Sequence, residues 1–479
     1  MKNFSPYKFL AVFACLMVNP VRAETGLQTE QLFLSFGEQG QLLSMQACFP
    51  DCQSASARKL NLVNGTGLIS FSALPGGRWQ LSEEQESKAH ILNFQGPDGA
   101  LLRWTIPATG YDFALESRGV GELTLRAGES FRAREAPGFG EWLEQVRYLA
   151  IDSGAVQQIA LDDTEVKELA AEWVGFRSRF WAVLLTADEL VPHTVQTGES
   201  NLDPVITSQA AAASMNWHFY LGPVERNALS ATDELLPDLM YAGLWFWLRW
   251  ICIILAFLLG WIQALLIAWG PSIMLLSALV GVLMLPLTRL ADQVQQQVNR
   301  TEARLAPELT RIKREFKGEA QAAAIIAYYK SAGVHPLYSL KSLLGVAIVI
   351  PIFIGAFDML AENIYLMNTP FLWVDDLSWP DHWFSLPYDL PFFGKGFNLL
   401  PFLMTGLSIY ASLLHQPLAL QADLRQRQVR NMILLAAVFF VLFYTFPAGM
   451  VLYWTTNNLI SVLKNLWNNM KAKRTQAGI

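Results

Sequence analysis

Charged residues are scarce in this chain: Asp, Glu, Lys and Arg make up 16% of its 479 residues, whereas hydrophobic residues make up 52%. In soluble proteins about a quarter of all residues are charged, so this composition excludes an ordinary soluble protein. The apolar excess lies almost entirely after Leu236. The sequence therefore predicts a soluble first half and a membrane-embedded second half, and the net charge of -6 averages two compartments.

Several well-known catalytic motifs are also absent from the sequence. It contains no HExxH, no GxSxG and no phosphate-binding GxxxxGK[ST]. Their absence argues against a zincin-type protease, a serine hydrolase with a nucleophile elbow and an ATP-driven pump. The carboxylates of Glu83, Glu84 and Glu86 are expected in a polar loop. We predict no catalytic residue, no metal site and no cofactor, and therefore not an enzyme.

Cysteine is rare as well, with four residues in the whole chain. Two of them, Cys48 and Cys52, stand close enough in sequence to close a small loop in an oxidising compartment. A metal site would need further ligands, and none of the six His lies near them in sequence. We therefore predict a structural disulfide between Cys48 and Cys52.

The first residues have the pattern of a secretory signal. Lys2 and Lys8 are basic, Phe9 to Val18 is a short apolar segment, and Ala23 ends a stretch that suits signal peptidase. We predict a signal peptide over residues 1–23, cleaved after Ala23. The next domain is then extracytoplasmic.

Residues 24–235 alternate between apolar and polar side chains in short runs separated by turn residues. Asn64-Gly65 and Pro97-Asp98-Gly99 are typical turn sequences. This pattern predicts a periplasmic all-β domain with two packed sheets. The predicted strands include Leu60–Val63, Gly67–Ser72, His90–Phe94, Leu101–Ile106, Tyr111–Glu116 and Glu122–Arg126.

Charge predicts the topology of the second half. The segment between Leu287 and His335 is rich in Lys and Arg, so it is expected in the cytoplasm. With the β-domain outside, only an odd number of crossings can precede that segment. Residues 236–268, which carry Trp247, Arg249 and Trp261, are therefore predicted to form an interfacial amphipathic helix.

The same reasoning predicts a five-span core over residues 269–466. Its first span is Trp269 to Leu285, and residues 288–335 form a cytoplasmic hairpin of two helices that breaks at Gly318. The connection from Asn363 to Gly396 is acidic and is placed outside. The basic tail, residues 467–479, is placed in the cytoplasm.

Polar residues occur within the last predicted span. Thr455, Thr456, Asn457 and Asn458 follow Phe446-Pro447-Ala448-Gly449 directly. An unpaired polar group in hydrocarbon costs free energy, so this run indicates a wet face inside the membrane. The alternative is that these side chains bond to carbonyls of their own helix or join neighbouring helices.

Short motifs along the chain resemble one family, the YidC/Oxa1/Alb3 membrane protein insertases, in the Gram-negative YidC form with a large periplasmic domain. The resemblance runs from about Trp173 to Leu466 and rests on the order and spacing of the motifs. They are Trp173-Val174-Gly175-Phe176-Arg177, Phe219-Tyr220-Leu221-Gly222-Pro223, Trp269-Gly270-Pro271-Ser272-Ile273, Pro286-Leu287-Thr288, Leu305-Ala306-Pro307-Glu308-Leu309, Tyr329-Lys330, His335-Pro336-Leu337, Pro351-Ile352-Phe353 and Phe446 to Tyr453.

The resemblance implies a β-supersandwich and a five-helix core with a hydrophilic groove open to the cytoplasm and the lipid. It implies an insertase and chaperone in the bacterial inner membrane that works without nucleotide hydrolysis on nascent membrane proteins. Lipids are implied as partners, the ribosome and the Sec translocon stay open, and no DNA is expected. The groove candidates are Ser277, Lys341, Ser342, Thr405, Ser408, Tyr453, Trp454, Thr455, Thr456, Asn457 and Asn458.

The sequence departs from the family at the position where most bacterial members carry a groove arginine. Here that residue is Gly281. Lys341 is a candidate replacement, or else an anchor to the lipid headgroups. Two other functions stay open: a solute channel or transporter with a polar cavity, and an assembly scaffold that does not insert clients.

Overall fold

The computed structural model describes residues 25–63, 67–126, 131, 136–152, 154–159, 167–197, 204–209, 214–335, 337–338, 340, 343–414 and 422–476. The predicted signal peptide lies outside the described residues. The chain divides into two compact units, each built from separate stretches of sequence. The first comprises Met1–Phe131, Leu161–Gly175 and Val183–Gly222, and the second comprises Arg132–Ala160, Phe176–Ala182 and Pro223–Ile479.

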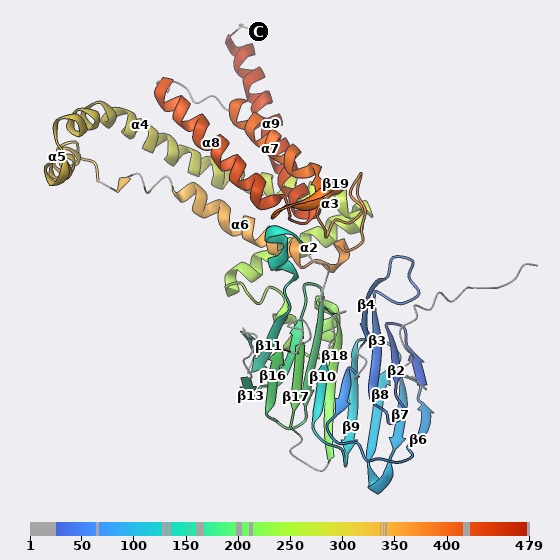
Figure 1. Ribbon diagram of the computed structural model, residues 1–479. Coiled ribbons are helices and arrows are strands. Elements are labelled where there is room, and N and C mark those ends of the chain that lie inside the picture. The colour runs from blue at the N-terminus through green and yellow to red at the C-terminus, as the bar shows by residue number, and fades with distance from the viewer. Residues whose placement is uncertain are drawn as a thin grey trace, which may run out of the picture. The chain divides into compact units, whose positions relative to one another are not determined.

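The first unit contains two sheets. One has the strand order β1-β2-β3-β5-β10-β17-β16-β13, with β4 paired to β3 (Figure 1). These strands are β1 (Thr25–Gln28), β2 (Leu32–Phe36), β3 (Leu42–Phe49), β4 (Arg58–Val63), β5 (Ile69–Phe71), β10 (Leu123–Arg126), β13 (Lys167–Leu169), β16 (His193–Thr197) and β17 (Pro204–Ser208).

In the first unit, the other sheet follows the order β14-β15-β18-β9-β8-β7-β6. Burial alternates along β8 and β9, as expected for strands with one face in a core and one in water. These strands are β6 (Gln80–Gln85), β7 (Ala89–Gln95), β8 (Leu101–Pro107), β9 (Asp112–Arg118), β14 (Trp173–Arg177), β15 (Trp181–Ala187) and β18 (Ser214–Pro223).

Aromatic rings hold the two sheets together. Phe36 of β2 lies 5.3 Å, ring centre to ring centre, from Trp104 of β8. Trp104 in turn lies 6.3 Å from Phe219 of β18, and its indole N–H donates to the Gly40 carbonyl at 2.9 Å. Because strands of both sheets contribute to this core, the unit is a β-sandwich, and the predicted all-β class is confirmed.

One local prediction in this unit is wrong. Glu83 and Glu84 belong to strand β6, which pairs with β7 along its whole length, and not to a loop. All of its side chains are exposed, so it lacks the apolar alternation that reveals a strand in a sequence. Charged side chains on an edge strand are a common protection against edge-to-edge aggregation.

Cys48 and Cys52 are joined by a disulfide at the end of β3. Next to it, the Tyr111 hydroxyl donates to the Cys48 carbonyl at 2.7 Å. The bridge and this hydrogen bond together fix the turn that leads from β3 to β4.

The second unit is mainly helical and contains two β-hairpins, so the predicted helical second half is confirmed. Its helices and strands are η3 (Gly138–Glu144), β11 (Arg147–Asp152), β12 (Ala155–Ile159), α1 (Arg226–Thr232), η4 (Leu236–Leu239), α2 (Phe246–Leu266), α3 (Trp269–Leu283), α4 (Leu285–Glu315), α5 (Gly318–Ser331), α6 (Leu343–Ala361), η6 (Ile364–Leu366), β19 (His382–Leu390), β20 (Gly394–Asn398), α7 (Leu399–Leu414), α8 (Ala422–Phe443) and α9 (Ala448–Gln476).

In the described part of the chain, α2 is the helix that is both long and apolar enough to cross a bilayer by itself. The pair α3 and α4, bent by 52° at its junction, meets the same criterion if the two are taken as one span. Shorter apolar helices cover Ala347–Ala361, Leu399–Leu414 and Val429–Phe443. Length and composition alone thus allow one or two complete crossings.

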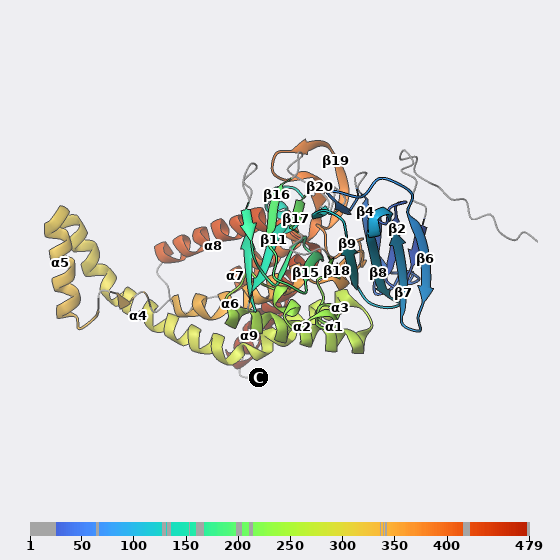
Figure 2. The ribbon, with the colours of Figure 1, turned by 90° about the horizontal axis from the view of Figure 1, so that it is seen from below.

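The helices of this unit pack around α9. It contacts α3, α6 and α7, while α2 packs on α3 and α6. Figures 1 and 2 both show α4 running away from the other helices and ending in α5. The second unit therefore has a packed helical core and a projecting helical pair.

Candidate functional site

The polar run of α9 begins just after a tightly held corner. The amide of Ala448 donates to the Trp379 carbonyl and that of Gly449 to the Leu377 carbonyl, both at 2.8 Å. These bonds satisfy N–H groups that a helix start otherwise leaves unpaired. A Cβ at Gly449 would lie 3.1 Å from the Leu377 oxygen, so glycine permits this close approach.

The two threonines of the run bond within their own helix. The Thr455 hydroxyl donates to the Val451 carbonyl at 2.7 Å, and the Thr456 hydroxyl donates to the Leu452 carbonyl at 2.8 Å. Each hydroxyl keeps lone pairs that can still accept a hydrogen bond. Thr456 is buried, whereas Thr455 is half-buried.

Asparagines of α9 join this helix to α7. The side-chain amides of Asn458, Asn465 and Asn469 donate to the carbonyls of Met404, Ala411 and Leu414, at 3.0, 2.9 and 3.1 Å. We call these three residues the asparagine ladder. Their spacing places them on one face of α9, so they bond to α7 along most of its length. Asn457 is half-buried and is not part of the ladder.

A further hydrogen bond joins α9 to α3. The Ser277 hydroxyl, fully buried, donates to the Tyr453 carbonyl at 2.9 Å. Tyr453 itself is 8% exposed and belongs to the core of the unit. Predicted groove residues from two distant parts of the sequence therefore meet at the contact between α3 and α9.

The predicted groove residues of α7 lie beside the ladder. The Thr405 hydroxyl oxygen is buried and has no hydrogen-bond partner among the described residues. Ser408 is half-buried, and its carbonyl accepts a hydrogen bond from the Ser412 hydroxyl at 3.0 Å. A buried hydroxyl without a protein partner is a place where water or another polar group would be stabilised.

Trp454 belongs to an aromatic cluster. Its ring centre lies 5.0 Å from that of Phe353 in α6, and 5.9 and 6.1 Å from those of Phe439 and Phe443 in α8. Trp454 thus helps to pack α6, α8 and α9 together. The neighbouring residue, Tyr453, contacts α3 instead, because its backbone carbonyl accepts the hydrogen bond from Ser277.

Gly281 faces open space. A Cβ built at this position would have no heavy atom within 4 Å beyond its own helix. Gly281 lies one helical turn after Ser277, so the two positions share a face of α3. The open space at Gly281, where the family resemblance implies an arginine, is therefore next to the contact between α3 and α9. Lys341 and Ser342 lie outside the described residues.

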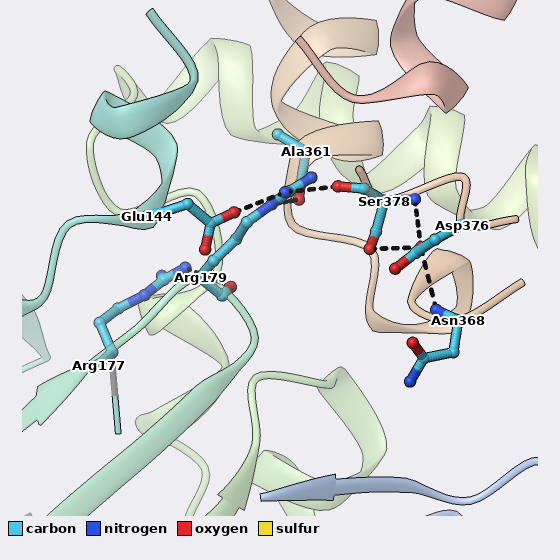
Figure 3. A network of polar contacts seen from close by, with 7 residues as sticks. All are labelled: Glu144, Arg177, Arg179, Ala361, Asn368, Asp376 and Ser378. Carbon is cyan, nitrogen blue, oxygen red and sulfur yellow. Dashed lines mark hydrogen bonds and ion pairs between the residues drawn. The ribbon is translucent and has the colours of Figure 1, made fainter. Parts of the chain in front are cut away.

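A buried guanidinium forms a second polar centre in the same unit (Figure 3). Arg179 donates to the Ala361 carbonyl at 2.6 Å, to the Ser378 carbonyl at 2.8 Å and to the Glu144 carboxylate at 2.9 Å. Its side chain is 3% exposed. Burial lowers the pKa of Arg179, and the Glu144 carboxylate opposes that shift. Arg179 therefore holds three separate chain segments together.

Arg177 makes a parallel set of contacts. It donates to the Leu239 carbonyl at 2.6 Å and pairs with the Glu362 carboxylate at 3.0 Å. The other oxygen of Glu362 accepts the amide of Tyr241 at 3.0 Å. Arg177 and Arg179, with these partners, are called the arginine clamp below. The clamp connects the chain before α2 to the chain after α6.

A cavity of about 30 Å³ adjoins the arginine clamp. This volume is enough for one or two water molecules. One oxygen of Glu144 and one terminal nitrogen of Arg179 are buried without a hydrogen-bond partner among the described residues, and bound water would satisfy such atoms. The cavity is lined by Trp142, Leu143, Gln145, Arg147, Arg177, Ser178, Arg179, Asp358, Ala361 and Glu362.

The sequence analysis missed the arginine clamp. The signal was the group Arg177-Ser178-Arg179, which begins with the last residue of the apolar strand β14 and precedes the apolar strand β15. Two arginines in such a position must find partners, because a buried charge is rarely left unpaired. Their partners lie up to 199 residues away along the chain and cannot be identified from local pattern.

Comparison with known proteins identifies the class of protein. Residues 261–475, from the end of α2 to the end of α9, match the family described as 60Kd inner membrane protein. This part of the chain is therefore similar to a class of inner-membrane proteins. The match and the similar sequences support a relation to the YidC/Oxa1 family.

Similar sequences carry the name membrane protein insertase YidC. The protein from Syntrophobacter fumaroxidans (strain DSM 10017 / MPOB) is 27% identical over 340 residues, which are 67% of this chain and 58% of that protein. The protein from Shewanella baltica (strain OS155) is 31% identical over 257 residues, 53% of this chain and 42% of that protein. The matches thus span about half the length of these relatives.

One solved structure in the comparison is entitled "Active YidC insertase crystal structure with the first transmembrane domain resolved". It aligns with 91% of this chain and 91% of its own, at 17% identity and a TM-score of 0.36.

Proposed function

We propose that this protein is a membrane protein insertase. It transfers hydrophobic segments of client proteins from the cytoplasm into the bilayer without nucleotide hydrolysis, and it acts as a chaperone while they enter. One observation carries the proposal: residues 261–475 match an inner-membrane family, and similar sequences are named insertases. The polar side chains of α3, α7 and α9 lie within this matched region.

The proposed mechanism follows from the physics of the bilayer. A polar chain segment that crosses hydrocarbon loses its water, which costs several kcal/mol for each unpaired backbone group or charge. A wet groove among α3, α7 and α9 would shorten the dry distance. The apolar segment of the client would then partition into lipid through the open side of the groove.

The hydrogen bonds of α9 suggest what the groove offers a client. Thr455 and Thr456 donate to their own helix, so they have lone pairs, and not donors, to offer. Gly281 supplies no positive charge. We infer a groove that favours client segments with N–H donors or positive charge over acidic segments.

The proposed topology places residues 24–235 in the periplasm, after a signal peptide of residues 1–23. Residues 236–268 lie in the outer interface, and five spans between residues 269 and 466 lead to a cytoplasmic tail at 467–479. Because α2 is long enough to cross, charge and not length supports this arrangement. Exposed arginines along α4, among them Arg300, Arg304 and Arg311, favour a cytoplasmic hairpin over residues 288–335.

The proposed partners follow from these surfaces. Nascent membrane proteins are the clients, and bilayer lipid surrounds the helices. The projecting pair of α4 and α5, with its exposed basic side chains, could bind ribosomal RNA or an acidic face of the Sec translocon through charge.

Photo-crosslinking tests the proposal. A photoreactive residue is placed at Gly281, where open space is available, or at Thr456 on α9. We expect crosslinks to ribosome-bound nascent membrane proteins from both sites. The matched control is Phe257 of α2, which is 72% exposed and lies outside the proposed groove. Crosslinks at Phe257 alone, or accumulation of a small solute in vesicles without any nascent-chain crosslink, would contradict an insertase.

A further inference from the structure

The hairpin of β19 and β20 exposes a group of aromatic side chains. Trp383, Phe384, Tyr388 and Phe392 are 54%, 48%, 61% and 43% exposed. A two-stranded hairpin has too little surface to bury such side chains by itself. Exposed apolar groups of this size commonly mark a contact with a membrane or another molecule.

The aromatic rings continue from the hairpin onto the helices. Phe384 of β19 stacks on Phe397 of β20 at 4.7 Å, and Phe397 stacks on Phe402 of α7 at 5.1 Å. Phe402 then meets Phe440 of α8 edge to face at 4.8 Å. We call these four rings the aromatic ladder. It makes one continuous apolar surface from the hairpin to two helices.

The helices at the end of the aromatic ladder expose apolar side chains. Phe402 and Leu403 of α7 are 43% and 40% exposed, and Leu434, Leu435 and Val438 of α8 are 65%, 57% and 57% exposed. Under the proposed function, these surfaces face the lipid. The aromatic ladder therefore extends a lipid-facing surface and does not form a separate patch.

Helix α7 is shorter than the hydrocarbon layer is thick, and the hairpin can supply the missing apolar surface. With 16 residues, α7 is about 24 Å long, whereas the hydrocarbon layer is about 30 Å thick. Such a mismatch must be met by extra apolar surface, by tilt or by a thinner bilayer. The hairpin directly precedes α7, so its rings extend the apolar surface beyond the start of that helix.

The hairpin is firmly attached at this place. The Asn398 side-chain amide donates to the Tyr444 carbonyl at 2.6 Å, and the Tyr444 hydroxyl donates to the Gly396 carbonyl at 3.0 Å. Asp381, just before β19, accepts the Leu400 amide at 2.6 Å. These bonds fix the hairpin to the start of α7 and to the end of α8. The aromatic ladder is therefore held in a fixed position on these two helices.

We propose that the β19–β20 hairpin is a membrane anchor whose aromatic side chains lie in the outer interface, among the lipid headgroups and upper acyl chains. The indole N–H of Trp383 and the hydroxyl of Tyr388 suit that depth, because their rings prefer the apolar side and their polar atoms the wet side. Lipid is the occupant because the surface is continuous with α7 and α8. The inference rests on the membrane topology of the proposed function.

Depth-dependent quenching of a fluorescent label tests the anchor. The full chain is labelled at Tyr388→Cys and reconstituted in vesicles of phosphatidylethanolamine and phosphatidylglycerol. Cys48 and Cys52 are in a disulfide and Cys252 is buried, so the new thiol is the reactive one among the described cysteines. We expect a headgroup spin label to quench Tyr388→Cys at least about threefold more than Glu83→Cys, an exposed control on β6.

Further arms separate the possible outcomes. Iodide quenching of Tyr388→Cys equal to that of Glu83→Cys would overturn the anchor, and so would protection from both lipid and water quenchers, which would indicate a protein occupant. A fluorescent label at Leu403→Cys tests whether α7 lies in the membrane, because a spin label deep in the acyl chain should then quench it. Deep quenching at Leu403 without lipid quenching at Tyr388 removes the anchor alone. Failure at both positions removes the proposed topology as well.

Discussion

Single polar residues in α9 serve different purposes although they are neighbours in sequence. Thr455 and Thr456 bond to their own helix, whereas Asn458 bonds to α7. Both alternatives to a wet face therefore occur in the structure, and hydration of the groove stays a proposal. The unpartnered hydroxyl of Thr405 and the open space at Gly281 are the observations that support it most directly.

Gly281→Arg introduces the arginine that the family resemblance implies at this position. The open space beside Gly281 lets the side chain enter without a clash at its Cβ, and the loss of a helix-interior glycine favours the helix by up to about 1 kcal/mol. Under the proposed function, we expect faster insertion of clients with acidic translocated tails, because an opposite charge in the proposed groove offsets their desolvation. The measurement is protease protection of such clients in proteoliposomes.

The neutral variant Gly281→Gln is the matched control for Gly281→Arg. It has a similar length and fills the same space but adds no charge. Equal effects of the two variants on acidic and neutral clients would show that charge at this position does not select clients.

His193 links the stability of the β-sandwich to pH. His193 is 1% exposed, its Nδ1 lies 2.7 Å from the Ser208 hydroxyl oxygen, and burial lowers its pKa to about 4. The unfolded chain, with an ordinary histidine pKa near 6.5, takes up a proton between those two values that the folded chain does not. We therefore expect the sandwich to lose about 3 kcal/mol of stability as the pH falls from 6.5 to 4.

Hydrogen exchange of the amides in β16 and β17 measures this loss, after correction for the intrinsic exchange rate at each pH. His193→Gln can keep a hydrogen bond to Ser208 but cannot titrate, so its protection should be flatter over the same range. An unchanged slope in His193→Gln would assign the pH dependence to other groups.

Among the elements, the helices were easier to predict than their contacts. The apolar run Trp269 to Leu285 coincides with α3, because long apolar runs are strong signals of buried or lipid-facing helices. Strand β6 was missed, since an exposed edge strand carries no apolar alternation. The asparagine ladder was also missed, because no local pattern shows which carbonyl an asparagine on α9 will meet.

The asparagine ladder should contribute modestly to the packing of α7 on α9. Asn458→Leu keeps the size of the side chain but removes the bond to Met404, and we expect a loss of about 0.5–1.5 kcal/mol. Adding Asn465→Leu should roughly double the loss, because the two bonds are separate. The midpoint of thermal unfolding in detergent is the measurement.

The control for the asparagine ladder is Asn468→Leu, an exposed asparagine of the same helix. It should leave the unfolding midpoint nearly unchanged. A midpoint in Asn458→Leu equal to that in Asn468→Leu would mean that the hydrogen bonds of the ladder add nothing to stability.

At the scale of the whole molecule, the compact units do not follow one boundary in the sequence. Residues 132–160 and 176–182 belong to the helical unit, although the sequence places them among the strands. The arginine clamp gives a reason, because Arg177, Arg179 and Glu144 bond to one another or to the chain around α6. The boundary at residue 235, where the chain is expected to pass from the periplasm to the membrane interface, remains a prediction.

Arg179→Met should disrupt the helical unit strongly. The change leaves the Glu144 carboxylate buried without its cation and leaves the Ala361 and Ser378 carbonyls without their donor, for which we expect a loss of about 3–5 kcal/mol. Arg118→Met removes an ion pair to Glu116 from a side chain that is 55% exposed, and should cost less than about 1 kcal/mol.

Thermal unfolding in detergent compares the two arginine variants, and Glu144→Gln in the Arg179→Met background should recover part of the loss. Equal midpoints for Arg179→Met and Arg118→Met would show that the clamp is not a major source of stability. A recovery by Glu144→Gln would assign the loss to the stranded charge and not to the change in side-chain shape.

The sequence alone determined the all-β first half, the helical second half, the main helices and the resemblance to one family, because turn residues, apolar periodicity and motif order are local properties of the chain. Only the tertiary structure decided that the asparagines of α9 bond to α7, that Gly281 faces open space and that two arginines near β14 hold the chain around α6. Those facts depend on contacts between residues that are far apart in sequence. Such contacts are selected by the total free energy of packing, which no short segment of sequence contains.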